Sequence, residues 1–423
     1  MQSRTLDFLR RHGMAPEFVE PMACVEAMLR DMWQGLRGQK SSMAMIPTYL
    51  SNEGDVARGS YAVVIDAGGT NFRSALLHFE EEGYCVEGLK KQSMPGIGQP
   101  CTWDEFISFV ADNVEPFMAQ TDLIGFCFSY SAEIMPDMDG RVNRIDKEVV
   151  VKGSEGKMIG ASLSKELARR GYPGKRVVVL NDTVAVLLGG AAGLDKSAYS
   201  GFIGQVSGTG TNTCATIKHS DVEKIRLRTQ GSMIINLECG QYNGFRRGDF
   251  DLALDAASNN PGQKQMEKMT AGVYLGQLAR LMLIAAADEG MLSQEGAEKV
   301  RALGNIDSAV IDAWASGEGY DNIGSDEKDQ ELARELSLAL FDRSARCMCT
   351  NLVALTLLMD AGRTKPVCVM AEGSLVQRGR HYRPALERLL AECCDVLDVK
   401  IELHIGNEST LPGSAAAALL NLS

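Results

Sequence analysis

The stretch "YAVVIDAGGTNFRSALLHF" (residues 61–79) places two apolar runs on either side of the glycine pair Gly68 and Gly69. Both runs are rich in strand-forming residues, so they predict two β-strands joined by a tight turn. Glycine has no Cβ and adopts positive φ readily, which lets the backbone N–H groups of such a turn approach an anion. For a single copy of this pattern, an ordinary β-hairpin is the favoured explanation.

A second copy lies in the other half of the chain. Residues 200–217, "SGFIGQVSGTGTNTCATI", again hinge two apolar runs on glycines, and "GTGTN" echoes the earlier "GGTN". Neither copy has the Gly-Lys-Ser/Thr of a Walker A loop or a dinucleotide fingerprint that opens a helix. The repetition favours phosphate binding over ordinary hairpins, and it predicts two similar domains that face a shared ligand cleft.

The remaining segments alternate strands with helices, which predicts an α/β fold. Apolar runs at 123–131, 176–182 and 232–240 predict strands, and helical patterns cover 103–119, 158–170, 331–361 and 409–421. A further helix begins near residue 265 and carries Glu267 near its start. Residues 303–330 are acidic and glycine-rich, so we expect an exposed excursion between helices there.

Composition narrows the classes of function. The net charge of −12 over 423 residues, without a basic run, argues against nucleic-acid binding. No apolar stretch has the length of a membrane span, so we expect no membrane partner and a cytoplasmic location. The 11 cysteines lack the Cys-x-x-Cys spacing of zinc sites, and the 5 histidines are scattered. We therefore expect carboxylates, and not histidines, to carry out any acid–base chemistry in this protein.

Asp66 stands two residues before Gly68, at the predicted end of a strand. A carboxylate beside phosphates suits Mg²⁺, held directly or through water. The alternative is an Asx-type turn residue, which is common at such a position. The sequence predicts Mg²⁺ binding at Asp66 if the turn binds a nucleotide.

"VVIDAGGTNFRSALL" resembles the first phosphate motif of the hexokinases, which are members of the actin-like ATPase superfamily. Further motifs resemble that family in the same order along nearly the whole chain. They are sugar-binding segments at 123–140 and 141–157, "VVVLNDTVAVLLGGAAG" at 177–193, "GQVSGTGTNTCATI" at 204–217, sugar-contact segments at 233–240 and 266–283, and "VCVMAEGSLVQR" at 367–378. The pattern is that of the eukaryote-type hexokinases and glucokinases.

This resemblance implies two actin-like (ribonuclease H-like) domains with a ligand cleft between them. The small domain would comprise 61–194 plus 408–423, and the large domain 1–60 plus 195–407. The implied reaction transfers the terminal phosphoryl group of ATP, with Mg²⁺, to the 6-hydroxyl of glucose or a similar hexose. The chain would act as a monomer or a homodimer.

The resemblance also assigns site residues one at a time. The Asp of "LNDTV" becomes the general base, Asp182, although by itself Asp182 would be predicted as the N-cap of the following helix. Lys147 is the second catalytic residue implied. The implied hexose contacts are Ser129, Asp146, Lys147, Asn181, Asp182, Asn212, Glu238 and Glu267. The implied nucleotide contacts are Asp66, Gly68, Gly69, Thr70, Asn71, Arg73, Gly208, Thr209, Gly210, Gly373 and Ser374.

Most of these residues have an ordinary structural reading as well. Ser129 and Asn212 suit turns, Lys147 a solvated surface, and Glu238 and Glu267 exposed element ends. Arg73 would reach a phosphate or pair with an acid. Their shared placement at strand ends and helix starts favours a binding site.

The sequence departs from the family pattern at four positions. Asp146 replaces the usual Thr before Lys147, and Ile145 the usual Trp; Ser131 stands for Pro and Glu372 for Asp. An ionised Asp146 accepts but does not donate hydrogen bonds, so a contact donated by the Thr hydroxyl would be lost. These departures bear on which hexose is chosen and how tightly it binds.

Two other classes of function compete with a hexokinase. A non-catalytic sugar sensor of the same fold would have less need of Asp182, Lys147 and both glycine hairpins. A nucleotide-dependent assembly protein related to actin would explain the hairpins but not the sugar motifs between them.

Overall fold

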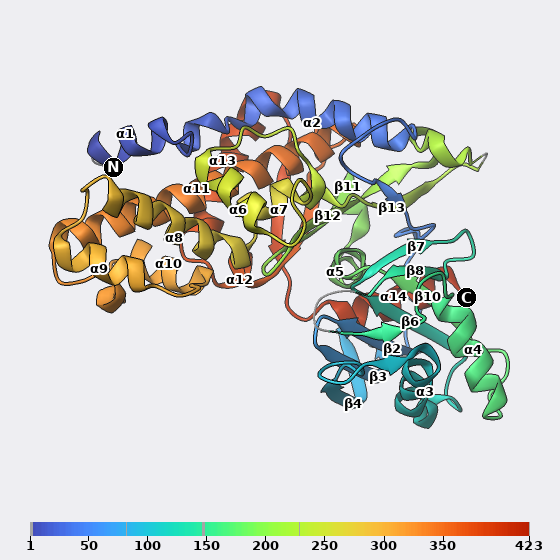
Figure 1. Cartoon of the computed structure of the whole chain (residues 1–423). Helices are drawn as coiled ribbons and strands as arrows, with labels where there is room; N and C mark the ends of the chain where they lie inside the picture. Colours follow the sequence, from blue (N-terminus) through green and yellow to red (C-terminus); the bar gives the residue numbers. More distant parts are fainter. Residues whose placement is uncertain (1–2, 82, 146–148, 228, 423) are drawn as a thin grey trace.

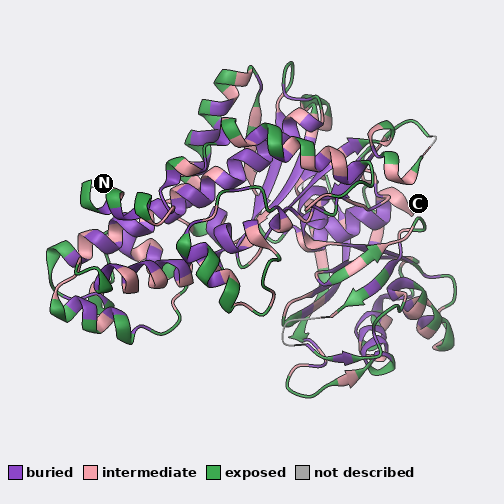
Figure 2. Cartoon of the chain, turned by 45° about the horizontal axis from the view of Figure 1, so that its top comes forward, coloured by how far each residue is buried: buried purple, intermediate pink, exposed green. Residues whose placement is uncertain are grey.

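The computed structural model describes residues 3–81, 83–145, 149–227 and 229–422. It has two bodies, each built on one β-sheet, with the helix-rich large body above and the smaller body at the lower right (Figure 1). Buried residues gather in the sheets and in the helices beside them, whereas exposed residues lie on the outer faces (Figure 2). The mixed α/β prediction is confirmed.

The small sheet has the strand order β10-β6-β2-β3-β4. Its strands are β2 (Tyr61–Gly68), β3 (Asn71–Phe79), β4 (Tyr84–Ser93), β6 (Leu123–Phe128) and β10 (Arg176–Leu180). The first three form an antiparallel meander, β6 runs parallel to β2, and β10 runs parallel to β6. The opening stretch of sequence is thus the central hairpin of this sheet.

The large sheet repeats this topology, with the strand order β1-β13-β12-β11-β14-β15. Its strands are β1 (Ile46–Pro47), β11 (Gly201–Ser207), β12 (Thr211–Lys218), β13 (Ser232–Asn236), β14 (Val367–Glu372) and β15 (Ile401–Ile405). Strands β11, β12 and β13 are antiparallel, β14 runs parallel to β11, and β15 runs parallel to β14. The sequence repeat therefore reflects two sheets of the same design.

Short strands and helices complete the chain. The short strands are β5 (Cys101–Thr102), β7 (Ser131–Ile134), β8 (Gly140–Arg144) and β9 (Val151–Lys152). The helices are α1 (Ser3–Arg11), α2 (Pro21–Leu36), α3 (Trp103–Val114), α4 (Ile159–Arg169), α5 (Asp182–Ala191), α6 (Asp249–Ala257), α7 (Gln265–Thr270), α8 (Gly272–Asp288), α9 (Gln294–Ala302), α10 (Ser308–Ala315), α11 (Glu327–Leu358), α12 (Ser374–Arg378), α13 (Tyr382–Leu397) and α14 (Thr410–Asn421). Among the described helices, none is both long enough and apolar enough to cross a bilayer.

Helices α5 and α14 lie between the two sheets and pack against each other (Figure 1). Their backbones are so close that a Cβ on Gly413 would lie 1.9 Å from the carbonyl oxygen of Ala185. Helix α5 also abuts β11, because a Cβ on Gly204 would lie 2.5 Å from the carbonyl oxygen of Thr183. This packing fixes the N-terminus of α5 against the second hairpin. The predicted domain boundaries themselves stay a prediction.

The structure corrects three details of the sequence reading. Residues 303–330 are not simply an exposed excursion, because they contain α10, whose Ile311 and Trp314 are fully buried. The predicted helix around Glu267 is two helices, α7 and α8, separated at Ala271, which has extended dihedral angles. Strands β10 and β13 end two residues before Asp182 and Glu238, so these carboxylates lie beyond the strand ends.

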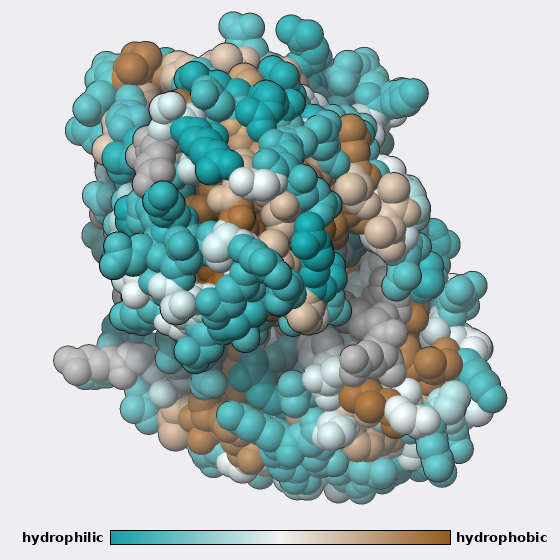
Figure 3. Space-filling model, turned by 60° about the vertical axis from the view of Figure 1, so that its left-hand side comes forward, coloured by the Kyte–Doolittle hydropathy of each residue, from teal (hydrophilic) through white to brown (hydrophobic). Residues whose placement is uncertain are grey.

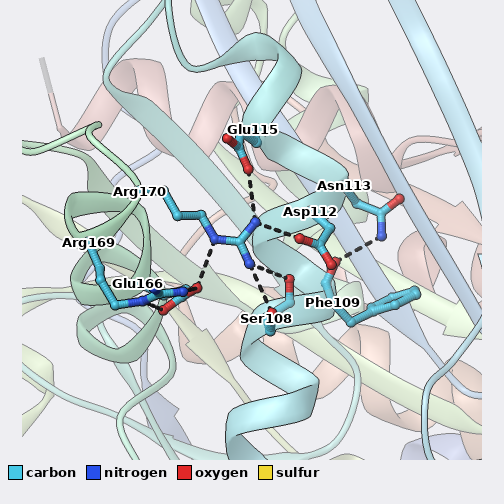
Figure 4. Close-up of polar contacts among 8 residues, drawn as sticks. All are labelled: Ser108, Phe109, Asp112, Asn113, Glu115, Glu166, Arg169 and Arg170. Atoms are coloured by element: carbon cyan, nitrogen blue, oxygen red, sulfur yellow. Dashed lines mark hydrogen bonds and ion pairs between the residues drawn. The ribbon is translucent and has the colours of Figure 1, made fainter.

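Arg170 joins the two helices that cover the outer face of the small sheet (Figure 4). Its guanidinium donates to Glu166 at 2.8 Å on α4, to Asp112 at 2.5 Å on α3, and to Glu115 at 2.9 Å. It also donates to the hydroxyl of Ser108 at 2.9 Å. Hydrogen bonds from Arg169 and Arg170 lower the pKa of Glu166 to about 2.

We expect Arg170→Met to lower the free energy of unfolding by about 1–3 kcal/mol, because it leaves several acceptors without their shared donor. Arg169→Met is the matched control: Arg169 pairs with Glu166 but is 71% exposed, so its loss should cost clearly less than that of Arg170. Urea unfolding at neutral pH measures both. The Glu166 pKa is depressed, so the contribution of its ion pair is complete above the unfolded pKa and fades toward about pH 2. Equal losses of unfolding free energy in Arg170→Met and Arg169→Met would show that the contacts of Arg170 between α3 and α4 add no stability.

Candidate active site

The two glycine hairpins occupy the same position in the two sheets. Gly68 ends β2 and pairs with Asn71 across the first turn, where Gly69 has a φ of +58°. In the second, the N–H of Gly208 donates to the carbonyl of Gly210 at 3.0 Å. Thr70 and Asn71 are exposed beyond the first turn. The surface is hollowed between the two bodies, and hydrophilic residues line much of the visible hollow (Figure 3).

A cavity of about 530 Å³ opens beside the second hairpin. Its lining includes Gly208, Thr209, Gly272, Ser374 and Arg378. The first hairpin, residues 68–71, does not line it. The cavity therefore brings together two of the predicted nucleotide segments, and it adds Gly272 and Arg378, which were not among the predicted contact residues.

Close backbone contacts form one wall of this cavity. A Cβ on Gly208 would lie 3.0 Å from the backbone nitrogen of Ser374, and one on Gly373 would lie 2.4 Å from the carbonyl oxygen of Ser207. Gly373 also has a φ of +112°, which side chains rarely allow. Gly373 therefore has no room for a side chain, and a side chain at Gly208 would require its neighbours to shift by a few tenths of an ångström.

Asp182 is the first residue of α5, and Asn181 is the N-cap. The side-chain oxygen of Asn181 accepts from the N–H of Thr183 at 2.9 Å, so the reading of Asp182 as the N-cap is wrong. Oδ1 of Asp182 accepts from the same N–H at 2.8 Å. Asp182 therefore lies at the N-terminus of α5, two residues beyond the end of β10.

Hydrogen bonds connect the side chains of Asn212, Asn236 and Glu238 at the end of β13. The amide nitrogen of Asn212 donates to Asn236 at 2.8 Å, and that of Asn236 donates to Oε1 of Glu238 at 2.9 Å. Glu238 has a φ of +58°, an unfavourable conformation for a residue with a side chain. Such strain is typical of functional positions, where the surrounding contacts maintain it. Asn236, which the sequence reading missed, positions both predicted sugar contacts.

Glu238 interacts electrostatically with carboxylates from two other elements. Burial raises the pKa of Glu238, and the charges of Asp182 and Glu267 raise it further. Oε2 of Glu267 accepts from the N–H of Thr211 at 3.3 Å, just after the second hairpin. The structure thus gathers Asp182, Glu238 and Glu267, predicted from three distant segments.

Lys264 supplies a positive charge that compensates the carboxylates of Glu238 and Glu267. Its Nζ lies 3.2 Å from Oε1 of Glu267. Burial alone would lower the pKa of Lys264, but the charges of Glu267 and Glu238 raise it above the ordinary value. Its φ of +51° makes it a second side chain with left-handed backbone near the site. No sequence motif pointed to Lys264, because its role depends on which carboxylates surround it.

Asp66 and Arg73 form an ion pair across the first hairpin. Nε of Arg73 donates to Oδ2 of Asp66 at 2.9 Å, and its Nη2 donates to the hydroxyl of Thr410 on α14 at 2.8 Å. Of the two readings of Arg73, the structure shows the pairing with an acid. Oδ1 of Asp66 lies toward the turn, 3.3 Å from where a Cβ on Gly68 would be.

Ser129 lies next to this hairpin. Its backbone N–H donates to the carbonyl of Ala67 at 3.1 Å, and its hydroxyl would lie 3.5 Å from a Cβ on Gly68. The predicted contacts Asp146 and Lys147 lie outside the described residues. Of the four departures from the family pattern, Glu372 has a clear contact: its Oε1 accepts from the N–H of Ser409 at 2.9 Å, where the chain enters α14.

Two family models described as hexokinase match this chain, one over residues 18–192 and the other over residues 202–420. The chain belongs to the hexokinase family. The first match covers the small sheet and Asp182, and the second covers the large sheet, apart from β1 and the first residue of β11, with most of its helices.

Individual members of the hexokinase family show the extent of the likeness. Mouse hexokinase-3 is 30% identical over 65% of this chain, a match that covers 30% of the mouse protein. Hexokinase-1 of Nicotiana tabacum is 27% identical over 94% of this chain and 86% of its own length. The structure of a Schistosoma mansoni hexokinase complexed with glucose is 21% identical, covers 98% of both chains and has a TM-score of 0.80, which confirms the fold.

Proposed function

We propose that this chain is an ATP-dependent hexokinase, which transfers the terminal phosphoryl group of Mg²⁺-bound ATP to the 6-hydroxyl of glucose or a similar hexose. The observation that carries the proposal is the meeting of Asp182, Glu238 and Glu267 beside the second glycine hairpin. All 11 cysteines are free, which suits a reducing compartment such as the cytoplasm.

Sugar hydroxyls are neutral groups that both donate and accept hydrogen bonds. Glu238 and Glu267 would accept from them, and the amides of Asn181 and Asn212 can both donate and accept. Asp182 would accept the proton of the attacking hydroxyl as phosphoryl transfer proceeds. Lys147 keeps its predicted catalytic role, and Ser129 and Asp146 keep theirs as sugar contacts.

The residues of the two glycine hairpins and of the 530 Å³ cavity are chemically suited to binding a nucleotide. Gly208, Thr209, Gly210, Gly373 and Ser374 would hold it along the glycine wall of the 530 Å³ cavity. Residues 68–71 would contact its phosphates from the other sheet. Oδ1 of Asp66 faces that turn, while the hydrogen bonds from Arg73 and Thr410 hold Oδ2. Mg²⁺, held through water by Asp66, would offset the phosphate charge.

ADP release with Mg²⁺ and ATP, measured across a panel of hexoses, tests this proposal directly. We expect ADP release that depends on the sugar, with glucose or a similar hexose giving the highest kcat/KM. Hexose binding by calorimetry without ADP release would contradict the proposal and support a sugar sensor. ADP release that no hexose stimulates would contradict it as well.

We expect Lys264→Met to move the acid limb of kcat/KM to higher pH. Glu238 binds sugar as a carboxylate in this proposal, and its pKa is already raised by burial. The charge of Lys264 lowers that pKa, so removing the charge raises it and activity is lost at a higher pH. The pH dependence of kcat/KM for the preferred hexose measures the shift.

Lys264→Arg is the matched control because it keeps the positive charge beside Glu267. We expect its acid limb to stay close to that of the wild type. An unshifted acid limb in Lys264→Met would show that Lys264 does not influence the ionisation that controls sugar binding.

A further inference from the structure

Four polar side chains lie together at the edge of the small sheet, away from the residues assigned to the active site. His78 on β3 pairs directly with Cys85 on β4. Glu80 follows His78 by two residues, and Glu87 follows Cys85 by two. Because side chains alternate between the faces of a strand, all four can share one face.

The spacing of three of these side chains suits a metal ion. The ligand atoms of His78, Glu80 and Cys85 all lie within 4.8 Å of one another. Nε2 of His78 lies 3.3 Å from Oε1 of Glu80, and two ligands of a tetrahedral zinc ion are separated by roughly 3.5 Å. Small side-chain rotations would bring the thiol to the same separation. One nitrogen, one oxygen and one sulfur donor form a set that zinc accepts.

The second ring nitrogen of His78 provides an independent observation. Nδ1 is buried and makes no hydrogen bond within the described part of the chain. It lies 3.5 Å from Oε1 of Glu87. A histidine that binds metal through one nitrogen usually donates the other N–H to a carboxylate, which orients the ring. Glu87 is placed for that role, and the ring of Tyr61 packs against His78 with centroids 4.6 Å apart.

We propose that this chain binds a zinc(II) ion through Nε2 of His78, the thiolate of Cys85 and the carboxylate of Glu80, with a fourth position open to water. Binding converts the Cys85 thiol to a thiolate, and its proton passes to solvent. The ion would link β3 to the edge strand β4 beyond their backbone hydrogen bonds. This site does not depend on the proposed kinase activity.

Titration of the chelator-treated full chain with Co²⁺ tests the site, because thiolate-bound cobalt absorbs in the near ultraviolet. We expect a thiolate band that saturates at one equivalent and disappears on addition of Zn²⁺. Cys85→Ser should abolish this band, and His78→Gln and Glu80→Gln should each weaken the affinity at least about tenfold. Cys101→Ser, which removes another partly exposed thiol of the small body, should leave the band intact.

A measurement on the wild-type chain avoids any effect of substitution on folding. We expect Zn²⁺ to slow the alkylation of Cys85 at least about tenfold, while Cys101 reacts at its usual rate. Mass spectrometry of the digested protein measures the extent of alkylation at each cysteine. Absence of a thiolate band in the wild type, its survival in Cys85→Ser, or unchanged alkylation of Cys85 would each overturn the proposal.

Discussion

Asp182→Asn should lower kcat by at least about a hundredfold, because the amide cannot accept the proton of the attacking hydroxyl. The fold should survive, since Asn keeps the Oδ1 atom that accepts from the N–H of Thr183 at 2.8 Å. Hexose affinity should change far less than kcat. Steady-state ADP release and calorimetric hexose binding separate the two effects.

Asp360→Asn is the matched control for the lost charge. Asp360 is exposed and has a φ of +49°, a conformation that Asn tolerates as well as Asp. We expect wild-type turnover from this variant. If Asp182→Asn also turned over at the wild-type rate, Asp182 would not be the general base, and its carboxylate would serve only the start of α5.

Gly373→Val should raise the KM for ATP at least about tenfold, because the glycine wall of the proposed nucleotide site has no room for a side chain at this position. A Cβ at this position would lie 2.4 Å from the carbonyl oxygen of Ser207, and the φ of +112° is strained for any side chain. The backbone must shift, and the wall shifts with it. The proposed hexose contacts come from other segments, so hexose affinity should stay near that of the wild type.

Gly304→Val is the control, since nothing lies within 4 Å of a Cβ on Gly304 and its φ is not positive. We expect it to keep the wild-type KM for ATP. Kinetics at saturating hexose measure both variants, with circular dichroism to confirm folding. An unchanged KM for ATP in a folded Gly373→Val variant would show that the glycine wall does not form part of the nucleotide site.

Local features were predicted well wherever neighbouring residues decide the structure. The glycine hairpins, the alternation of strands and helices, and the helix that starts near Asp182 all follow from local propensity and turn chemistry. The N-cap was assigned one residue too late, because Asn181 and Asp182 are both good caps and only the geometry shows which one caps α5. The acidic segment 303–330 was misread because its charges hid the short apolar pattern of Ile311 and Trp314.

Other features depend on which distant segments meet. The cluster of His78, Glu80 and Cys85 escaped the sequence reading because its members face each other across two strands, without the spacing of a zinc motif. Asn236 and Lys264 matter through contacts with Glu238 and Glu267, and neither belongs to a pattern by itself. Side-chain contacts of this kind are set by packing.

By itself, the sequence determined that this protein has two glycine hairpins in a duplicated α/β framework, because a turn that needs glycine and strands that need β-forming residues are local requirements. Only the tertiary structure decided how the carboxylates of that framework meet. Asp182, Glu238 and Glu267 come from three elements, and the packing of α5 against β11 brings the first toward the other two. Their mutual repulsion, the burial of Glu238 and the closeness of the Lys264 charge to these carboxylates exist only once the chain has folded.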